Sequence, residues 1–337
     1  MILHNRPTIG REEISAISRV INSKYIVQGK EVKKFENAFA EYYNLKSNNV
    51  VAVNNGTSAL YLALWALNAK QKKVYYPNYS CSSLRNATSL IGGKERLLDV
   101  KFKSPLIEEY NFRKNSIVIN PHMYGFPSVI KKKSIQVIED SCQSLGIKRN
   151  NQPFLSGKIT IFSFYATKMM TTAGQGGMIV SKNTSLINEI RDYLNFDYRR
   201  DNKIRFNFQM TDVQASMGIV QLKKLNKFIA KRKEIFKFYK NLKLPLLDLK
   251  YNENFEPVRY RSIILNKNPN KIIKEFKKFN IQIINPLQRW ELLSKSKKYK
   301  NSIDLSSQTI SLPCYPSLKK KELIRIEQVI DRVSSLL

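Results

Sequence analysis

Apolar positions along the chain change from helical spacing near the start to an alternation of strands and helices after residue 50. In residues 8–22 and 31–43 the apolar side chains follow a helical period, which predicts two amphipathic helices separated by Gly29. Residues 58–69 are apolar nearly all round, which is typical of a buried helix. Short apolar runs predict strands at 50–53, 73–76, 96–100, 116–120, 136–138, 159–164 and 178–181.

This alternation predicts an α/β fold with a mostly parallel seven-stranded sheet and helices on both of its faces. A long helical stretch follows at about residues 211–241. Beyond it lie a strand-like run at 261–265, a helix at 270–279 and a closing amphipathic helix with Ile326 and Val333 on one face. We therefore expect a large domain, residues 1–235, that includes the N-terminal helices, and a smaller C-terminal α+β domain, residues 236–337.

Candidate functional residues follow the ends of three predicted strands. Gly56 opens a helix after the first strand, Asp140 closes the fifth, and Lys168 follows the sixth and precedes a Gly-rich turn at 174–177. Ligands of such sheets bind at the carboxyl ends of the strands. An amine, a carboxylate and an anion-binding helix start are what pyridoxal 5′-phosphate requires. The sequence thus predicts an enzyme in which Lys168 binds this cofactor covalently and Asp140 pairs with its ring nitrogen.

Other residues near these positions have both a functional and an ordinary interpretation. Thr57 and Ser58 add hydroxyl donors to the helix start, although an ordinary capped helix has the same residues. Asp140 alone is also compatible with a strand-end residue that caps the next turn. Gln143 could reach the phenolic oxygen of the cofactor or bond only to backbone, and Ser163 could donate to the phosphate. The argument therefore depends on the combination and the order of these residues.

Composition adds a strong positive charge. The chain has 58 Lys and Arg against 26 Asp and Glu, a net charge of +32, which attracts anions at long range. Because the lysines are spread along the whole chain, a solvated surface is the favoured interpretation, help in binding an anionic substrate comes second, and nucleic-acid binding is a remote alternative. Three separated cysteines and two histidines predict no metal site.

We expect a cytoplasmic protein without a membrane span. The chain contains no apolar run approaching the roughly 18 residues of a membrane helix. Its first residues, from Met1 to Pro7, include no apolar signal core.

Beyond these separate residues, the order of several motifs resembles the DegT/DnrJ/EryC1/StrS family of sugar aminotransferases over almost the whole chain. The motifs are Arg-Pro-Thr-Ile-Gly at 6–10, Tyr-Ile-Val-Gln-Gly at 25–29, Asn-Gly-Thr-Ser-Ala-Leu at 55–60, His-Met-Tyr-Gly at 122–125, Glu-Asp-Ser-Cys-Gln at 139–143, Phe-Ser-Phe at 162–164 with Thr-Lys at 167–168, Gly-Gly-Met at 176–178, Asn207 with Met-Thr-Asp-Val-Gln-Ala at 210–215, and Leu-Pro-Cys-Tyr-Pro at 312–316.

The resemblance implies a type I aminotransferase fold and a set of residue roles. Lys168 would bind the cofactor and shuttle a proton, while Asp140 and Gln143 would contact the ring nitrogen and ring oxygen. The phosphate would be held by Gly56, Thr57, Ser58, Ser163 and, from the neighbouring subunit of a homodimer, Asn207. Residues on the substrate side would include Tyr25, Tyr165 and Tyr315.

By the same resemblance, the reaction would move an amino group from L-glutamate to the keto group of a sugar linked to a nucleoside diphosphate (dTDP, UDP or GDP), in aminosugar or surface polysaccharide synthesis. An aminocyclitol or another keto compound is the alternative substrate. Where many members have an aromatic residue over the cofactor ring, this chain has Cys81, so that the stacking would be lost, replaced by a thiol contact, or supplied by a neighbour such as Tyr79. Gln175 and Gln209 also depart from the usual pattern. Since the lysine is present, the dehydratase relatives that carry His there are not favoured.

Overall fold

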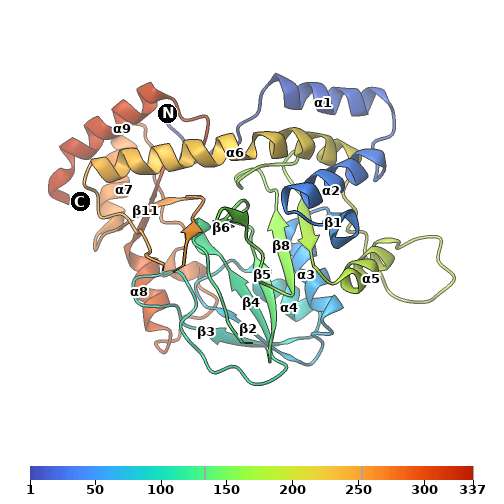
Figure 1. Ribbon diagram of the computed structural model, residues 1–337. Helices are drawn as coiled ribbons and strands as arrows, with labels where there is room; N and C mark the ends of the chain where they lie inside the picture. Colours follow the sequence, from blue (N-terminus) through green and yellow to red (C-terminus); the bar gives the residue numbers. More distant parts are fainter. Residues whose placement is uncertain (133, 252, 337) are drawn as a thin grey trace.

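The computed structural model describes residues 1–132, 134–251 and 253–336 (Figure 1). No helix among these described residues is both long and apolar enough to cross a membrane. The helices are α1 (Arg11–Asn22), α2 (Lys30–Tyr42), α3 (Gly56–Ala66), α4 (Ser83–Leu90), α5 (Thr184–Leu194), α6 (Asp212–Asn241), α7 (Pro269–Lys278), α8 (Lys300–Gln308) and α9 (Lys320–Arg332). Short 3-10 turns lie at Ser47–Asn49, Met123–Gly125, Arg289–Glu291 and Ser334–Leu336.

A seven-stranded sheet forms the centre of the molecule, in the order β1-β9-β8-β5-β4-β2-β3. Only β9 runs against its neighbours, so the predicted mostly parallel sheet is confirmed. Its strands are β1 (Val50–Val53), β2 (Lys73–Pro77), β3 (Lys94–Leu98), β4 (Ile117–Pro121), β5 (Gln136–Asp140), β8 (Ile159–Ser163) and β9 (Gly177–Val180). A second sheet has the order β10 (Phe255–Glu256), β6 (Lys148–Arg149), β7 (Gln152–Pro153), with β6 in the middle. A third sheet pairs β11 (Ser262–Leu265) with β12 (Thr309–Leu312).

Helices cover both faces of the sheet, and the side chains of β1 pack against the helices on both sides. Val51 and Val53 pack into the core beneath α3 and α5, whereas Val50 and Ala52 pack into the core beneath α2 and α6. Successive side chains of a strand point to opposite faces, so a strand buried on both sides is apolar throughout. Helix α3 is buried nearly all round, which confirms the interpretation of its continuous apolar sequence.

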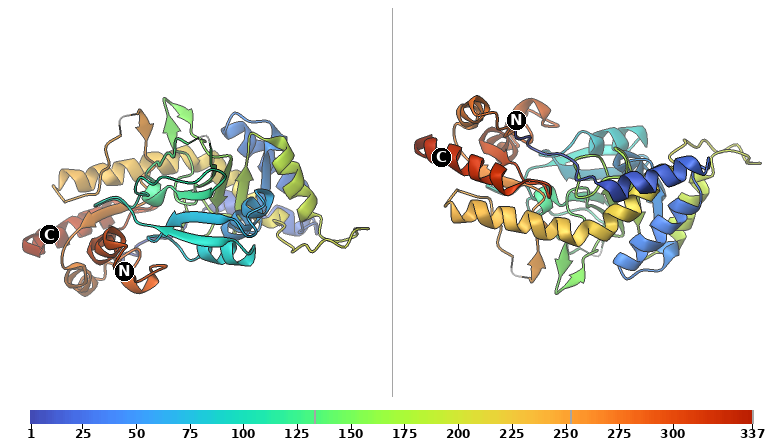
Figure 2. Two further views of the ribbon diagram at one scale, coloured as in Figure 1. Left: turned by 90° about the horizontal axis from the view of Figure 1, so that it is seen from below. Right: turned by 90° about the horizontal axis from the view of Figure 1, so that it is seen from above.

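Helix α6 runs along one side of the molecule from the sheet region to the C-terminal helices (Figures 1 and 2). It begins with a capping box in which Thr211 and Gln214 satisfy each other's backbone N–H groups. Its first residue, Asp212, accepts hydrogen bonds from the backbone N–H groups of Gly29 and Val32, each at 2.9 Å. The start of α6 therefore also caps α2, which fixes the two helices against each other.

The C-terminal region has its own apolar core around β11, β12, α7 and α9, to which the end of α6 contributes Ile235 and Tyr239. Residue 235, where we placed the domain boundary, lies inside α6. The division into domains 1–235 and 236–337 stays a prediction. The helix expected within residues 8–22 is present as α1, although two of its apolar side chains, Ile14 and Ile21, are exposed.

A buried carboxylate, Glu139 of β5, joins three segments near the sheet edge where the strands end. It accepts hydrogen bonds from the backbone and hydroxyl of Ser156 and from the hydroxyl of Thr160. On its other side, His122 Nε2 lies 3.2 Å from Glu139 Oε1. The backbone N–H of Ser128 donates to His122 Nδ1, which assigns the ring proton to Nε2.

Because of these contacts, the contribution of Glu139 to the free energy of unfolding depends on pH. Burial raises the pKa of Glu139, but His122 and the Ser156 donors outweigh it and lower the pKa from 4.5 to about 2. Because the folded pKa is depressed, the stabilisation is present above about pH 4.5 and is lost as the pH falls toward 2. At roughly 1.4 kcal/mol per pKa unit, a shift of this size corresponds to about 3 kcal/mol.

We therefore expect Glu139→Gln to lower the free energy of unfolding at pH 7 by about 3 kcal/mol and to flatten its decline below pH 4.5. Urea titrations between pH 7 and pH 3 measure both effects. Glu109→Gln is the matched control, since that carboxylate is 95% exposed. Equal pH profiles for the two variants would contradict this role of Glu139.

Candidate active site

A cavity of about 260 Å³ opens at the edge of the sheet where β1, β4, β5 and β8 end. The start of α3 and the loops after β2, β4 and β8 complete its wall. Its lining residues are Asn55, Gly56, Thr57, Leu60, Ser80, Cys81, Ser83, Leu84, Pro121, His122, Met123, Asp140, Cys142, Gln143, Ile161, Ser163, Tyr165, Lys168 and Gln175. Eight of the residues predicted from the sequence thus meet in one place, namely Gly56, Thr57, Cys81, Asp140, Gln143, Ser163, Tyr165 and Lys168.

The start of α3 lies directly against the end of β8. A Cβ atom on Gly56 would come within 2.8 Å of the Ser163 Cβ, so only glycine allows this close approach. Helix α3 has eleven residues, and its first N–H groups and the Thr57 side chain face the cavity. An anion bound there would meet free backbone donors and the positive end of the helix dipole.

Ser58 differs from the prediction in its position. It does not line the cavity, and the Asn55 side chain accepts hydrogen bonds from its backbone N–H at 2.9 Å and from its hydroxyl at 3.2 Å. Asn55 is thus the N-cap of α3 and lines the cavity itself. The sequence analysis did not select Asn55, although its place before Gly56 is an N-cap signal.

Asp140 and Gln143 are held in place by backbone donors from the turns around them. The backbone N–H of Cys142 donates to Asp140 Oδ1 at 3.0 Å, and the backbone N–H of Tyr124 donates to Gln143 Oε1 at 2.8 Å. Cys142, which the sequence analysis did not select, lines the cavity between them. Burial and the neighbouring Asp140 charge raise the pKa of the Cys142 thiol well above its usual value, so the thiol stays neutral.

Lys168 lies in a tight loop between β8 and β9. The loop is closed by hydrogen bonds from Phe164 N to the carbonyl of Gly176 at 2.8 Å and from Ala166 N to the carbonyl of Gly174 at 3.1 Å. Burial lowers the pKa of the Lys168 amine, whereas Tyr260, Cys142 and Asp140 raise it. Their combined effect is larger than that of burial, so the pKa of Lys168 lies above its usual value. The amine is therefore an ammonium, and the Asp140 charge is one of those that favour this form.

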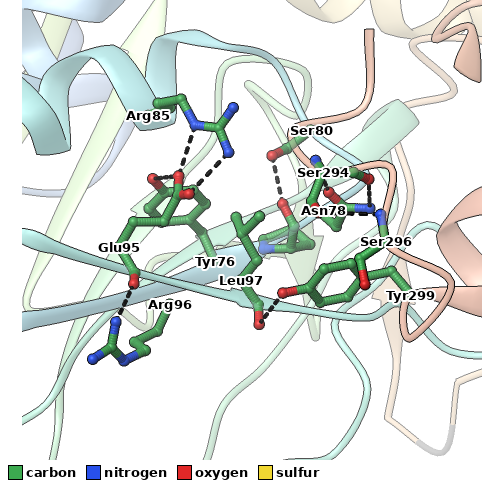
Figure 3. Close-up of polar contacts among 11 residues, drawn as sticks. Tyr76, Asn78, Ser80, Arg85, Glu95, Arg96, Leu97, Ser294, Ser296 and Tyr299 are labelled. Atoms are coloured by element: carbon green, nitrogen blue, oxygen red, sulfur yellow. Dashed lines mark hydrogen bonds and ion pairs between the residues drawn. The ribbon is translucent and has the colours of Figure 1, made fainter. Parts of the chain in front are cut away.

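The loop after β2 brings Cys81 to the cavity mouth, where its thiol is exposed. Figure 3 shows how this loop is fixed. Asn78 exchanges two hydrogen bonds with the backbone of Ser294, at 3.0 and 2.6 Å, and the Ser80 hydroxyl donates to the carbonyl of Pro77 at the end of β2. Tyr79 is buried, and its hydroxyl pairs with Tyr124 and Thr309. Tyr79 does not line the cavity, whereas Cys81 does, together with Ser80 and Ser83.

Besides Ser58, three predicted residues lie outside the cavity. Tyr25 is 77% exposed in the connection between α1 and α2, and Tyr315 is buried in the C-terminal core, with the Arg6 guanidinium 5.1 Å from its ring centre. Asn207 lies in the extended segment before α6, where its side chain accepts from the backbone N–H of Gln209. Of the three predicted substrate residues, only Tyr165 lines the cavity, and it is 46% exposed.

The residues present fit pyridoxal phosphate. An amine, a carboxylate and a helix start with free N–H groups line one cavity, which are the partners that an aldehyde, a pyridine nitrogen and a phosphate require. Among the residues that the structure describes, no group of three or more His, Cys, Asp or Glu side chains could hold a metal ion.

Comparison with known proteins agrees with this geometry. The model of the DegT/DnrJ/EryC1/StrS aminotransferase family matches residues 7–333. The UDP-4-amino-4,6-dideoxy-N-acetyl-beta-L-altrosamine transaminase of Campylobacter jejuni is 30% identical over 71% of this chain and 69% of its own length. The GDP-perosamine synthase of Escherichia coli O157:H7 is 26% identical over 98% of both chains.

Solved structures show the same fold. The aminotransferase TlmJ from Streptoalloteichus hindustanus superposes with a TM-score of 0.89, 20% identity and 99% coverage of both chains. Helicobacter pylori PseC, an aminotransferase involved in the biosynthesis of pseudoaminic acid, superposes with a TM-score of 0.86, 22% identity and full coverage of both. Since the family model spans nearly all of it, the chain belongs to the DegT/DnrJ/EryC1/StrS aminotransferase family, whose cofactor is pyridoxal 5′-phosphate.

Proposed function

We propose that this aminotransferase moves an amino group from L-glutamate to the keto group of a sugar linked to a nucleoside diphosphate, in aminosugar or surface polysaccharide synthesis. The observation that carries the proposal is the meeting of Lys168, Asp140 and the start of α3 in one cavity. Two relatives named for UDP- and GDP-linked aminosugars support the substrate class. The net charge of +32 suits a substrate with a diphosphate.

Six residues of the cavity have a role in this proposal. Bound pyridoxal phosphate supplies an electron sink for the carbon that carries the amino group. Lys168 holds the cofactor covalently at rest and, as a free amine, moves a proton from the substrate carbon. Asp140 keeps the ring nitrogen protonated, and Gln143 orients the ring through its oxygen. The N–H groups at the start of α3, with Thr57 and Ser163, bind the phosphate.

We also propose a homodimer in which Asn207 completes the phosphate site of the partner. Asn207 lies outside the cavity of its own chain, in a segment where Tyr198 is 99% and Ile204 is 83% exposed. Exposed apolar groups of this kind favour burial against another surface. We place the enzyme in the cytoplasm, because all three cysteines are free thiols, as a reducing compartment keeps them.

The proposal is tested by the absorbance of the cofactor-loaded protein before and after addition of L-glutamate. The expected result is that the absorbance band of the pyridoxal form of the cofactor is replaced by that of the pyridoxamine form, with release of 2-oxoglutarate. UDP-, GDP- and dTDP-linked keto-sugars are then added separately, and mass spectrometry detects replacement of the keto oxygen by an amine. Conversion of a keto-cyclitol but of no keto-sugar would replace the substrate class, and a protein indifferent to glutamate would reject this amino donor.

Lys168→Ala removes the amine and should lower transamination at least about a thousandfold, because among the described residues that line the cavity no other carries an amine. Turnover with glutamate and the thermal melt are measured together. Lys158→Ala is the matched control, since Lys158 is exposed just before β8, at the strand's opposite end. Retained activity of Lys168→Ala would sink the assignment.

Asp140→Asn keeps the shape of the side chain and its bond from Cys142 N, but removes the charge. We expect a decrease of about a hundredfold or more in turnover, because the ring nitrogen is then poorly protonated. The ultraviolet–visible spectrum across pH follows that protonation. An unchanged rate would mean that another group pairs with the nitrogen.

Asn207→Ala should weaken cofactor retention about tenfold, the effect of one lost hydrogen bond to a charged group. Equilibrium dialysis measures retention, and sedimentation measures the oligomeric state. Asn202→Ala, an exposed change in the same segment, is the control. A fully active monomer would contradict the shared site.

A further inference from the structure

The N-terminal segment, residues 2–8, runs from the C-terminal region to the loop between β8 and β9. Ile2 forms an isolated parallel bridge with Ile281 and packs into the C-terminal core. His4 Nε2 lies 2.8 Å from the hydroxyl of Ser311 on β12, which is a hydrogen-bond distance. Figures 1 and 2 show the N-terminus beside the C-terminal helices. The first residues of the chain are therefore fixed to the C-terminal region.

Arg6 holds the same segment to the loop before α9 and to α9 itself. Its guanidinium donates to the carbonyl of Ser317 at 3.1 Å and forms an ion pair of 3.5 Å with Glu322. Asn5 thus lies between two residues, His4 and Arg6, whose side chains both bind the C-terminal region.

The Asn5 side chain instead binds the loop that carries Lys168. Its Nδ2 donates to the carbonyl of Thr167 at 2.9 Å. This carbonyl belongs to the same peptide group as the N–H of Lys168, which donates to the carbonyl of Tyr165 at 2.9 Å. Because a peptide group is planar, one hydrogen bond at its oxygen and another at its nitrogen fix its orientation. The direction in which the Lys168 side chain leaves the backbone therefore depends on Asn5.

The residues after Asn5 border Lys168 on a second side. Lys168 lines a small cavity of about 10 Å³ together with Arg6, Pro7 and Thr8. Among the described residues, Lys168 alone lines both this cavity and the one of about 260 Å³. A cavity of the smaller size holds about one water molecule. The N-terminal segment therefore leaves the lysine little room to turn away from the larger cavity.

We propose that Asn5 is a positioning residue for Lys168 and makes the geometry of the amine depend on the packing of the C-terminal region. The amine must reach both the cofactor and the substrate carbon, and a displacement of about 1 Å can lower such a rate about a hundredfold. Asn5 does not line the larger cavity, so it acts through the Thr167–Lys168 peptide group. The sequence analysis did not select Asn5, since 162 positions separate it from Thr167.

This inference rests on the proposed function only in assigning the reaction to Lys168, so its first test uses the full chain freed of cofactor. Asn5→Leu keeps the size of the side chain and removes the donor. Asn5 Oδ1 is buried without a partner among the described residues, so the fold loses little else. Hydrogen–deuterium exchange, read by mass spectrometry, should be about fivefold faster at residues 165–169, the effect of one lost hydrogen bond. Exchange in α3 and β11 should match the parent.

Turnover of the cofactor-loaded protein with L-glutamate separates positioning from a purely structural role. Asn5→Leu should lower kcat about tenfold and leave KM for glutamate unchanged, because the amine is displaced while the residues that line the cavity remain. Asn5→Gln keeps an amide donor and should recover part of the lost kcat.

Asn301→Ala is the matched control. Asn301 Nδ2 also donates to a distant carbonyl, that of Val100 at 2.8 Å, and neither residue lines the cavity. This variant should lower the melting temperature and change neither kcat nor the exchange of residues 165–169. Parent-like exchange of residues 165–169 in Asn5→Leu overturns the inference, and so does a change in KM with kcat unchanged. Faster exchange in a protein whose loaded form is indifferent to glutamate would support the hold of Asn5 on Lys168 and reject the proposed function.

Discussion

The buried carboxylate of Glu139 is the constraint on which the arrangement of the site depends. A carboxylate withdrawn from water is costly unless donors surround it, and here the donors come from His122 after β4 and from the Ser156–Thr160 stretch that enters β8. The carboxylate can be satisfied only if these strand ends are in register. It therefore fixes the sheet edge from which Asp140 and the Lys168 loop project.

Two adjacent acids of β5 thus have different tasks because a strand alternates its faces. Glu139 points into the protein and stabilises the fold, whereas Asp140 points into the cavity and stays available to a ligand. A similar division applies at α3, where Asn55 satisfies Ser58 so that the N–H groups nearer the helix start remain free. In both cases a structural residue beside the reactive one sets its geometry.

The fold and the main cavity residues were predictable because their signals are local. Apolar runs predicted all seven strands of the sheet, and Gly56, Asp140 and Lys168 each lie at or shortly after the end of a strand. Tyr25 and Tyr315 lie elsewhere, since the positions of these side chains depend on how the N-terminal helices and the C-terminal core pack. Exposure of Ile14 and the hydrogen bond of Asn5 to Thr167 are likewise set by tertiary packing, which a periodic pattern does not encode.

Helix α6 is continuous over 30 residues, about 45 Å, and contributes to the cores of both the sheet region and the C-terminal region. Such a rod couples the two regions mechanically, since either can turn relative to the other only by bending the helix. The loops at the strand ends and the start of α3 form the wall of the cavity. An engineer who wished to change the substrate could exchange those loops and leave the two cores and the helix between them intact.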